Sequence, residues 1–249
     1  MKSEIKICLK HGEYESWQKA TGFTPCETCA NEQKLREKRI SRLQHAGIPM
    51  RFLEATFESY HATTEAQQYA LTVARSYAEE FRSHRRAGRC MVMVGRVGTG
   101  KTHLALAIAQ HVIEAGFRTR YASVCDVISE IRATWRNDAP ETEAGVLHRY
   151  TACDLLVLDE VGVQYGTESE QLELFKVFNK RYNDVRPTIV LSNVTTEELK
   201  GYLGERVFDR LRENEAKVIQ FDWESERGKR TRPGSVVEEH DLPRGLDVR

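Results

Sequence analysis

Residues 90–116 constrain the fold of this chain more than any other stretch, because they hold a phosphate-binding P-loop in its required context. The loop, Gly95-Arg96-Val97-Gly98-Thr99-Gly100-Lys101-Thr102, has the form G-x-x-x-x-G-K-[ST]. An apolar run over residues 90–94 predicts a buried strand before it, and residues 103–115 predict a helix that ends at Gly116. A strand, a glycine-rich loop and a helix in this order predict a nucleotide-binding α/β domain.

Each part of the loop has a function in phosphate binding. We expect the glycines to let backbone N–H groups turn towards the phosphates, and the helix N-terminus to add a partial positive charge. Lys101 can reach the β- and γ-phosphates, and Thr102 can hold Mg²⁺. The loop therefore predicts a bound nucleoside triphosphate with Mg²⁺, and all eight loop residues are expected to contact the nucleotide.

Strands and helices alternate along the rest of the chain. Strands are expected over residues 119–123, 155–159, 188–191 and 217–221, and helices over residues 33–44, 65–81, 124–136, 170–182, 197–203 and 206–212. This alternation predicts a parallel sheet sandwiched by helices. With 249 residues, the chain can hold one sizeable core and a small additional module.

Composition and charge exclude several classes of protein. Lys+Arg and Asp+Glu both number 37, so the net charge is zero and any nucleic-acid binding must depend on local patches. No stretch approaches the roughly 18 apolar residues of a membrane span. The N-terminus does not read as a signal peptide, so we expect a cytoplasmic protein without a membrane partner. Cys90, Cys125 and Cys153 are expected to be buried thiols.

Two polar strand ends predict hydrolysis. Asp159 and Glu160 follow the strand over residues 155–159, where Asp159 would serve Mg²⁺ and Glu160 would polarise the attacking water. Asn193 follows the next strand and could hydrogen-bond the γ-phosphate and that water. The alternatives are a solvated acidic turn and a turn-forming asparagine.

A short helix over residues 206–212 carries the candidate arginine finger. Arg206 and Arg210 are four residues apart and share a helix face. One of them could enter the ATP site of a neighbouring subunit and stabilise charge in the transition state. The alternative is a surface helix with salt bridges to Glu205 and Asp209.

The N-terminus predicts a small zinc module. Cys8 and His11 form one pair of potential ligands and Cys26 and Cys29 form another, each with two intervening residues. Such pairs suit a tetrahedral, structural Zn²⁺ site, and about 30 residues are too few to build a stable core without one. The alternative is three incidental cysteines and a surface histidine.

Several motifs together resemble a known family. GRVGTGKT, LLVLDE, IVLSN and LGERVFDRLR occur in the order seen in AAA+ ATPases of the DnaC/IstB group. The segments GIPMRF and VGVQ also look like this group, and the resemblance spans about residues 47–225. The chain departs from the best-known DnaC-type loaders at its N-terminus, where a purely helical arm would be expected.

The resemblance implies further residue roles. Asn193 would be sensor 1, Arg210 the finger with Arg206 as the alternative, and Arg227 the sensor 2 arginine, although Arg230 and Arg232 lie close by. Members hold single-stranded DNA inside a spiral of subunits, and the matching positions here are Trp135, Arg136, Tyr165 and Thr167. The alternative is that Trp135 packs at the edge of the core and that the loop over residues 164–169 faces solvent.

The resemblance also implies a function and a division of the chain. We expect a zinc module over residues 1–33, a basic helix and partner-docking linker over 34–62, an AAA+ domain over 63–226 and a loose tail over 227–249. The function implied is ATP-dependent loading of a hexameric, DnaB-type helicase onto single-stranded DNA by a self-associating spiral. The alternatives are an IstB-type transposition helper ATPase and a non-enzymatic adaptor that binds zinc and DNA.

Overall fold

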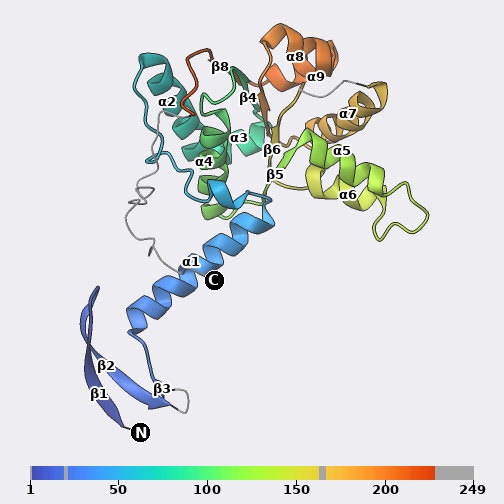
Figure 1. Cartoon of the computed structure of the whole chain (residues 1–249). Helices are drawn as coiled ribbons and strands as arrows, with labels where there is room; N and C mark the ends of the chain where they lie inside the picture. Colours follow the sequence, from blue (N-terminus) through green and yellow to red (C-terminus); the bar gives the residue numbers. More distant parts are fainter. Residues whose placement is uncertain (1, 20–21, 163–166, 228–249) are drawn as a thin grey trace, which may run out of the picture.

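The computed structural model describes residues 2–19, 22–162 and 167–227, which form an α/β domain and an N-terminal arm (Figure 1). The arm comprises residues 2–19 and 22–45. It consists of three short strands followed by the long helix α1 (Glu27–His45), whose N-terminal half projects away from the domain.

The described part of the domain contains a parallel sheet of five strands. These are β4 (Met91–Gly95), β5 (Thr119–Ser123), β6 (Leu155–Asp159), β7 (Thr188–Ser192) and β8 (Lys217–Phe221), in the spatial order β5-β6-β7-β4-β8. All residues of β6 and β7 are buried, as expected for central strands that are covered on both faces. The predicted parallel sheet is therefore confirmed, and β7 lies between the P-loop strand and β6.

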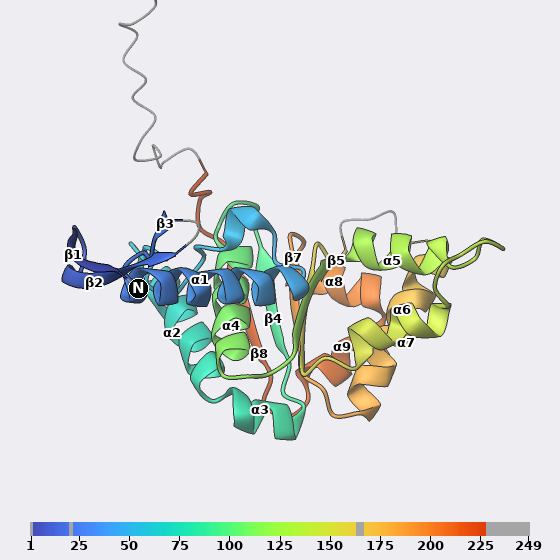
Figure 2. The same ribbon diagram turned by 90° about the horizontal axis from the view of Figure 1, so that it is seen from below.

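Helices pack against both faces of this sheet (Figure 2). On one face, α2 (Glu65–Glu79), α3 (Phe81–Ala87) and α4 (Lys101–Glu114) form a core with the odd-numbered residues of β4. On the other, α5 (Val124–Ala133), α6 (Glu143–Thr151), α7 (Glu168–Asn183), α8 (Thr196–Leu203) and α9 (Glu205–Arg212) pack on the even-numbered residues. No described helix has the length and apolar character needed to span a membrane.

Some elements differ from the sequence-based expectation. The helix expected over residues 65–81 is α2, and α3 follows it after Glu80. Helix α5 ends at Ala133, because Thr134 caps it and donates its hydroxyl to the Ile131 carbonyl at 2.6 Å. Helix α6 was not predicted, since only Val146, Tyr150 and Thr151 of its nine residues are buried. The expectation that Cys125 is buried was wrong, because it lies on the exposed side of α5.

The arm begins with an antiparallel sheet that the sequence did not predict. Strands β1 (Ser3–Cys8), β2 (Gly12–Lys19) and β3 (Gly22–Phe23) pair in sequence order. Helix α1 starts at Glu27, earlier than expected, and crosses the expected boundary at residue 33. Its C-terminal half joins the domain, where Leu43 is fully buried and Arg39 donates hydrogen bonds to Gln110 and Glu114 of α4.

Candidate nucleotide site and metal centre

The order of the strands gathers the predicted residues at the carboxyl edge of the sheet. Val94 of β4 pairs with Ser192 of β7, so the chain leaves these neighbouring strands at Gly95 and at Asn193. Parallel sheets bind ligands at this edge. A cavity of about 190 Å³ lies there, and its lining includes Lys101, Thr102, Asp159, Glu160, Asn193 and Arg227.

Lys101 is the buried cation of this cavity. Its side chain is turned back onto the loop, where Nζ donates to the carbonyl oxygens of Gly95 at 2.7 Å and Arg96 at 2.6 Å. Burial, opposed by the charge of Asp159 and assisted by that of Arg227, lowers the pKa of Lys101 to about 8. A triphosphate would replace the two carbonyls as the partner of this ammonium.

We therefore predict that affinity for ATP falls as pH rises above about 8. Below that pH, Lys101 is already protonated and adds no pH dependence. Above it, binding must take up one proton, so affinity falls by up to about tenfold per pH unit. Calorimetric titrations in buffers of different ionisation enthalpy measure both the affinity and the proton uptake. Unchanged affinity and no proton uptake across pH 8 would contradict this account of Lys101.

Asp159 joins three elements at the end of the cavity. Its Oδ2 accepts hydrogen bonds from the Thr102 hydroxyl and from the Tyr121 hydroxyl, both at 3.0 Å. Its Oδ1 accepts from the backbone N–H of Glu160 at 2.7 Å. A hydroxyl beside a carboxylate supplies the hard oxygen ligands that Mg²⁺ prefers.

Glu160 is held in an unusual backbone conformation. Its φ is +61°, in the left-handed region, which costs a non-glycine residue about 1–3 kcal/mol. The next residue fixes this turn, because Val161 N–H donates to the Leu191 carbonyl at 3.0 Å and the Ser192 hydroxyl donates to the Val161 carbonyl at 2.5 Å. The turn leaves the Glu160 side chain exposed at the cavity, opposite Asn193 on the neighbouring strand end.

The segment after β8 packs on the P-loop. Trp223 Nε1 donates to the Thr99 carbonyl at 3.0 Å, and Glu226 N–H donates to the Gly98 carbonyl at 2.9 Å. These contacts bring Arg227 to the start of the loop, in agreement with its place in the cavity lining. Arg230 and Arg232, the neighbouring candidates, lie outside the described residues.

Sequence reasoning missed three residues near the nucleotide site. Tyr121 lies in β5, where the strand pattern gives no sign of its bond to Asp159. Arg51 lines the cavity, and Tyr60 covers the loop so closely that a Cβ at Gly100 would lie 2.7 Å from its ring. Arg51 belongs to the GIPMRF segment, whose only signal was its resemblance to a family.

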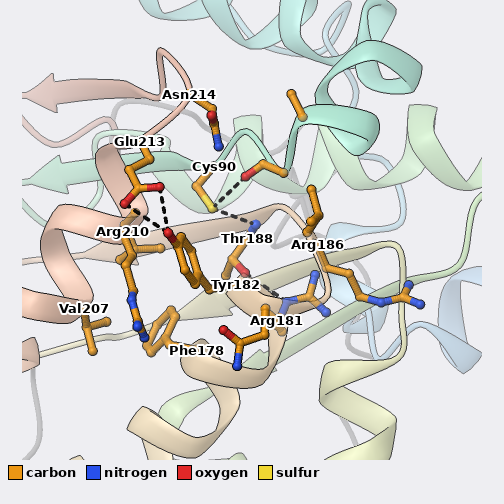
Figure 3. Close-up of a pocket in the computed structure, with 15 residues that line it drawn as sticks. Cys90, Phe178, Arg181, Tyr182, Arg186, Thr188, Val207, Arg210, Glu213 and Asn214 are labelled. Carbon is orange, nitrogen blue, oxygen red and sulfur yellow. Dashed lines mark hydrogen bonds between the residues drawn. The ribbon is translucent and has the colours of Figure 1, made fainter.

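Arg210 lies away from the nucleotide cavity of its own chain. Its Nη1 donates to Asn179 Oδ1 at 2.6 Å, and its guanidinium lies 4.5 Å from the centre of the Tyr182 ring. Arg210 and Tyr182 lie in the wall of a separate cavity, which has a volume of about 360 Å³ (Figure 3). Arg206 is exposed, and Glu205 pairs with Lys200 instead of with either arginine.

The structure places the described DNA candidates at the surface. Trp135 is 54% exposed and donates from Nε1 to Glu143 at 3.3 Å, so it does not pack into the core. Arg136 is exposed and pairs with Asp138, whereas Thr167 caps α7. An ion pair between Arg132 and Glu170 joins these two segments. Tyr165 lies outside the described residues.

The four N-terminal candidates converge on one point. Cys8 ends β1, His11 lies in the following turn, and Cys26 and Cys29 begin α1. Their ligand atoms all lie within 4.8 Å of one another, with 3.6 Å between the sulfurs of Cys8 and Cys29. Tetrahedral coordination with metal–sulfur bonds of about 2.3 Å gives sulfur–sulfur distances of about 3.8 Å. The cluster could therefore hold one metal ion.

A carboxylate supports this cluster from outside. His11 approaches the metal position with Nδ1, which lies 3.3 Å from the sulfur of Cys29, and its Nε2 lies 3.2 Å from Glu32 Oε1. Metal-bound histidines commonly donate their second ring N–H to a carboxylate, which fixes the tautomer and the ring orientation. Glu32 belongs to the second turn of α1, so the cluster and the helix are positioned together.

Comparison of the sequence with known families and proteins gives a consistent result. The family model described as IstB-like ATP binding protein matches residues 27–233. The replicative helicase loader DnaC of Escherichia coli K12 is 34% identical over 233 residues, which are 93% of this chain and 93% of that protein. DnaC of Buchnera aphidicola subsp. Schizaphis graminum is 32% identical over 85% of each chain.

Solved structures resemble the domain as well. A crystal structure of the DnaC helicase loader superposes with a TM-score of 0.63 and 23% identity over 70% of this chain and all of that chain. DnaA from Aquifex aeolicus with bound AMPPCP gives a TM-score of 0.56 and 26% identity over 69% of this chain and 51% of that chain.

Proposed function

The chain belongs to the family of IstB-like ATP-binding proteins, and we propose that it loads a hexameric, DnaB-type replicative helicase onto single-stranded DNA. The observation that carries this proposal is the 34% identity to a replicative helicase loader, which covers 93% of both chains and so extends beyond the ATPase domain into the arm. The IstB-like family model starts at residue 27, within the arm, so the part of this similarity that lies before residue 27 is what favours a loader.

The chain is an AAA+ P-loop ATPase by family and fold, and we propose the following roles for its residues. Lys101 and the loop N–H groups bind the phosphates, while Thr102 and Asp159 hold Mg²⁺. Glu160 orients the attacking water, and Asn193 contacts both that water and the γ-phosphate. Arg227 lies at the start of the loop, as a sensor 2 arginine would.

We propose that Arg210 is the finger that acts on a neighbouring subunit. Arg210→Ala should leave ATP binding within about twofold of wild type, because Arg210 lies outside its own nucleotide cavity. Hydrolysis by the assembled protein should fall by about 10³-fold, the usual effect of losing a finger. Arg206→Ala is the matched control and should retain hydrolysis. If the control lost turnover and Arg210→Ala kept it, the assignment would pass to Arg206.

The arm is the proposed helicase-docking part, and its cluster the proposed zinc site. Three thiolates and an imidazole with all four positions filled suit a structural Zn²⁺ and leave no open position for catalysis. Exposed Trp135 and Arg136, with Tyr165 and Thr167, would contact single-stranded DNA by stacking and phosphate binding. Self-association into a spiral would bring these positions of successive subunits onto one strand.

The second candidate function is that of an IstB-type transposition helper ATPase, since the matching family model takes its name from IstB. Both functions use the same ATPase site and differ in the partner. Size-exclusion chromatography with the hexameric helicase encoded by the same genome separates them. Co-elution that depends on ATP supports loading, whereas no complex at micromolar concentrations would contradict it.

A further inference from the structure

The segment between α1 and α2 places a cation in the nucleotide cavity that no P-loop motif contains. Arg51 belongs to a 3₁₀ turn, Met50–Phe52, and lines the cavity together with Lys101 and Asp159. Its guanidinium lies 4.7 Å from the centre of the Phe52 ring. Within the described residues no carboxylate forms an ion pair with Arg51, so its charge is available to a ligand.

Arg51 lies at the carboxylate end of the cavity. Its charge acts on the Tyr121 phenol, and the Tyr121 hydroxyl donates to Asp159. Arg227 lies beside Gly98, where the chain after β8 contacts the loop. A Mg²⁺ ion held by Thr102 and Asp159 would bridge the β- and γ-phosphates, so the terminal phosphate would lie on the side of Asp159 and Arg51.

We infer that Arg51 binds the γ-phosphate of ATP, from the same chain and from the segment that follows the arm. A guanidinium suits this role because its planar set of donors can bind two phosphate oxygens at once. The inference rests on the proposed ATPase site and adds to it a residue that distinguishes ATP from ADP.

Tyr121, which lies near Arg51, also contacts the chain where the arm ends. Tyr121 N–H donates to the Ala46 carbonyl at 2.7 Å, directly after α1. Gly47 has a φ of +80°, and a Cβ there would lie 2.5 Å from the Tyr121 carbonyl oxygen. The end of α1 and Tyr121 thus form one packed unit, and Arg51 belongs to the turn that follows this helix. When Arg51 binds the γ-phosphate of ATP, it connects the end of α1 to the nucleotide. ADP has no γ-phosphate, so this connection is absent when ADP is bound.

Nucleotide selectivity tests the inference. Binding of ADP and of β,γ-methylene-ATP is measured calorimetrically for wild type, Arg51→Ala, Arg51→Lys and the exposed control Arg86→Ala. We expect Arg51→Ala to weaken binding of the ATP analogue by about tenfold to 100-fold, the range for hydrogen bonds to charged groups, with ADP within about twofold. Arg51→Lys should lose less, and Arg86→Ala nothing. Equal losses for both nucleotides, or no loss, would overturn the inference.

Hydrogen exchange provides a second readout. Amides at residues 43–47 should exchange more slowly with the ATP analogue than with ADP in wild type, and equally in Arg51→Ala. Identical exchange with both nucleotides in wild type would remove the connection to the arm. Both measurements use the full chain without helicase, so their failure is distinguishable from failure of the proposed loading function.

Discussion

Lys101→Ala should lower the affinity for ATP by more than about 100-fold and leave the protein folded. Lys101 lines the cavity, and its Nζ donates two short hydrogen bonds to the loop. A triphosphate would accept these bonds, and hydrogen bonds to charged groups contribute about 1.5–3 kcal/mol each. Without the ammonium, the phosphates would face the carboxylates of Asp159 and Glu160 with one compensating cation fewer.

Calorimetry measures the affinity, and thermal unfolding measures the fold. ATP at about 100 times its Kd should stabilise wild type by about 2.7 kcal/mol and raise its melting temperature, whereas Lys101→Ala should show no rise. Lys34→Ala, an exposed lysine of α1, is the matched control and should behave like wild type. A Lys101→Ala variant with wild-type affinity would contradict the assignment of the site.

Cys26→Ser should remove the metal from the arm and unfold its strands, while the ATPase domain remains folded. The strands expose Ile5, Ile7 and Trp17 and bury only Ser16 fully, so they have almost no core of their own. A structural Zn²⁺ contributes about 10–16 kcal/mol to the folding of such modules. Helicase affinity should fall by at least about 100-fold if the arm is the docking part.

Metal analysis and hydrogen exchange check this prediction. Wild type should contain one zinc per chain and protect the amides of β1 and β2, and Cys26→Ser should show neither. Cys125→Ser changes an exposed cysteine of α5 and should keep the metal. Protected strands in the metal-free variant would mean that the arm folds without zinc. An intact complex with the helicase would mean that docking does not use the strands.

The residues of the nucleotide site that could be predicted belong to motifs at strand ends. The apolar patterns of β6 and β7 are clear from the sequence, and Asp159 and Asn193 stand where these strands end. Lys101 begins the helix after the P-loop strand, and a parallel sheet brings such ends to one edge. Arg51 and Tyr121 could not be predicted in this way. Their position depends on the path of the segment after α1 along β5, which no local pattern specifies.

The remaining differences have equally local causes. Residues 143–151 contain a glycine and few apolar side chains, and α6 is stabilised by packing against α5 and α7. Strands β1 and β2 alternate apolar and polar residues that are mostly exposed, so no buried apolar face predicts their pairing. Arg210 of α9 contacts Asn179 of α7, which is 31 residues away in the sequence, and no sequence motif includes both residues.

Loading of the helicase onto circular single-stranded DNA tests the central proposal most directly, because a closed circle has no end to thread through a ring. Circular DNA is incubated with the cognate hexameric helicase, ATP and this protein, and helicase retained on the DNA is measured after a high-salt wash. We predict retention with wild type and none with Lys101→Ala or without ATP. Equal retention of the helicase with and without this protein would contradict the account.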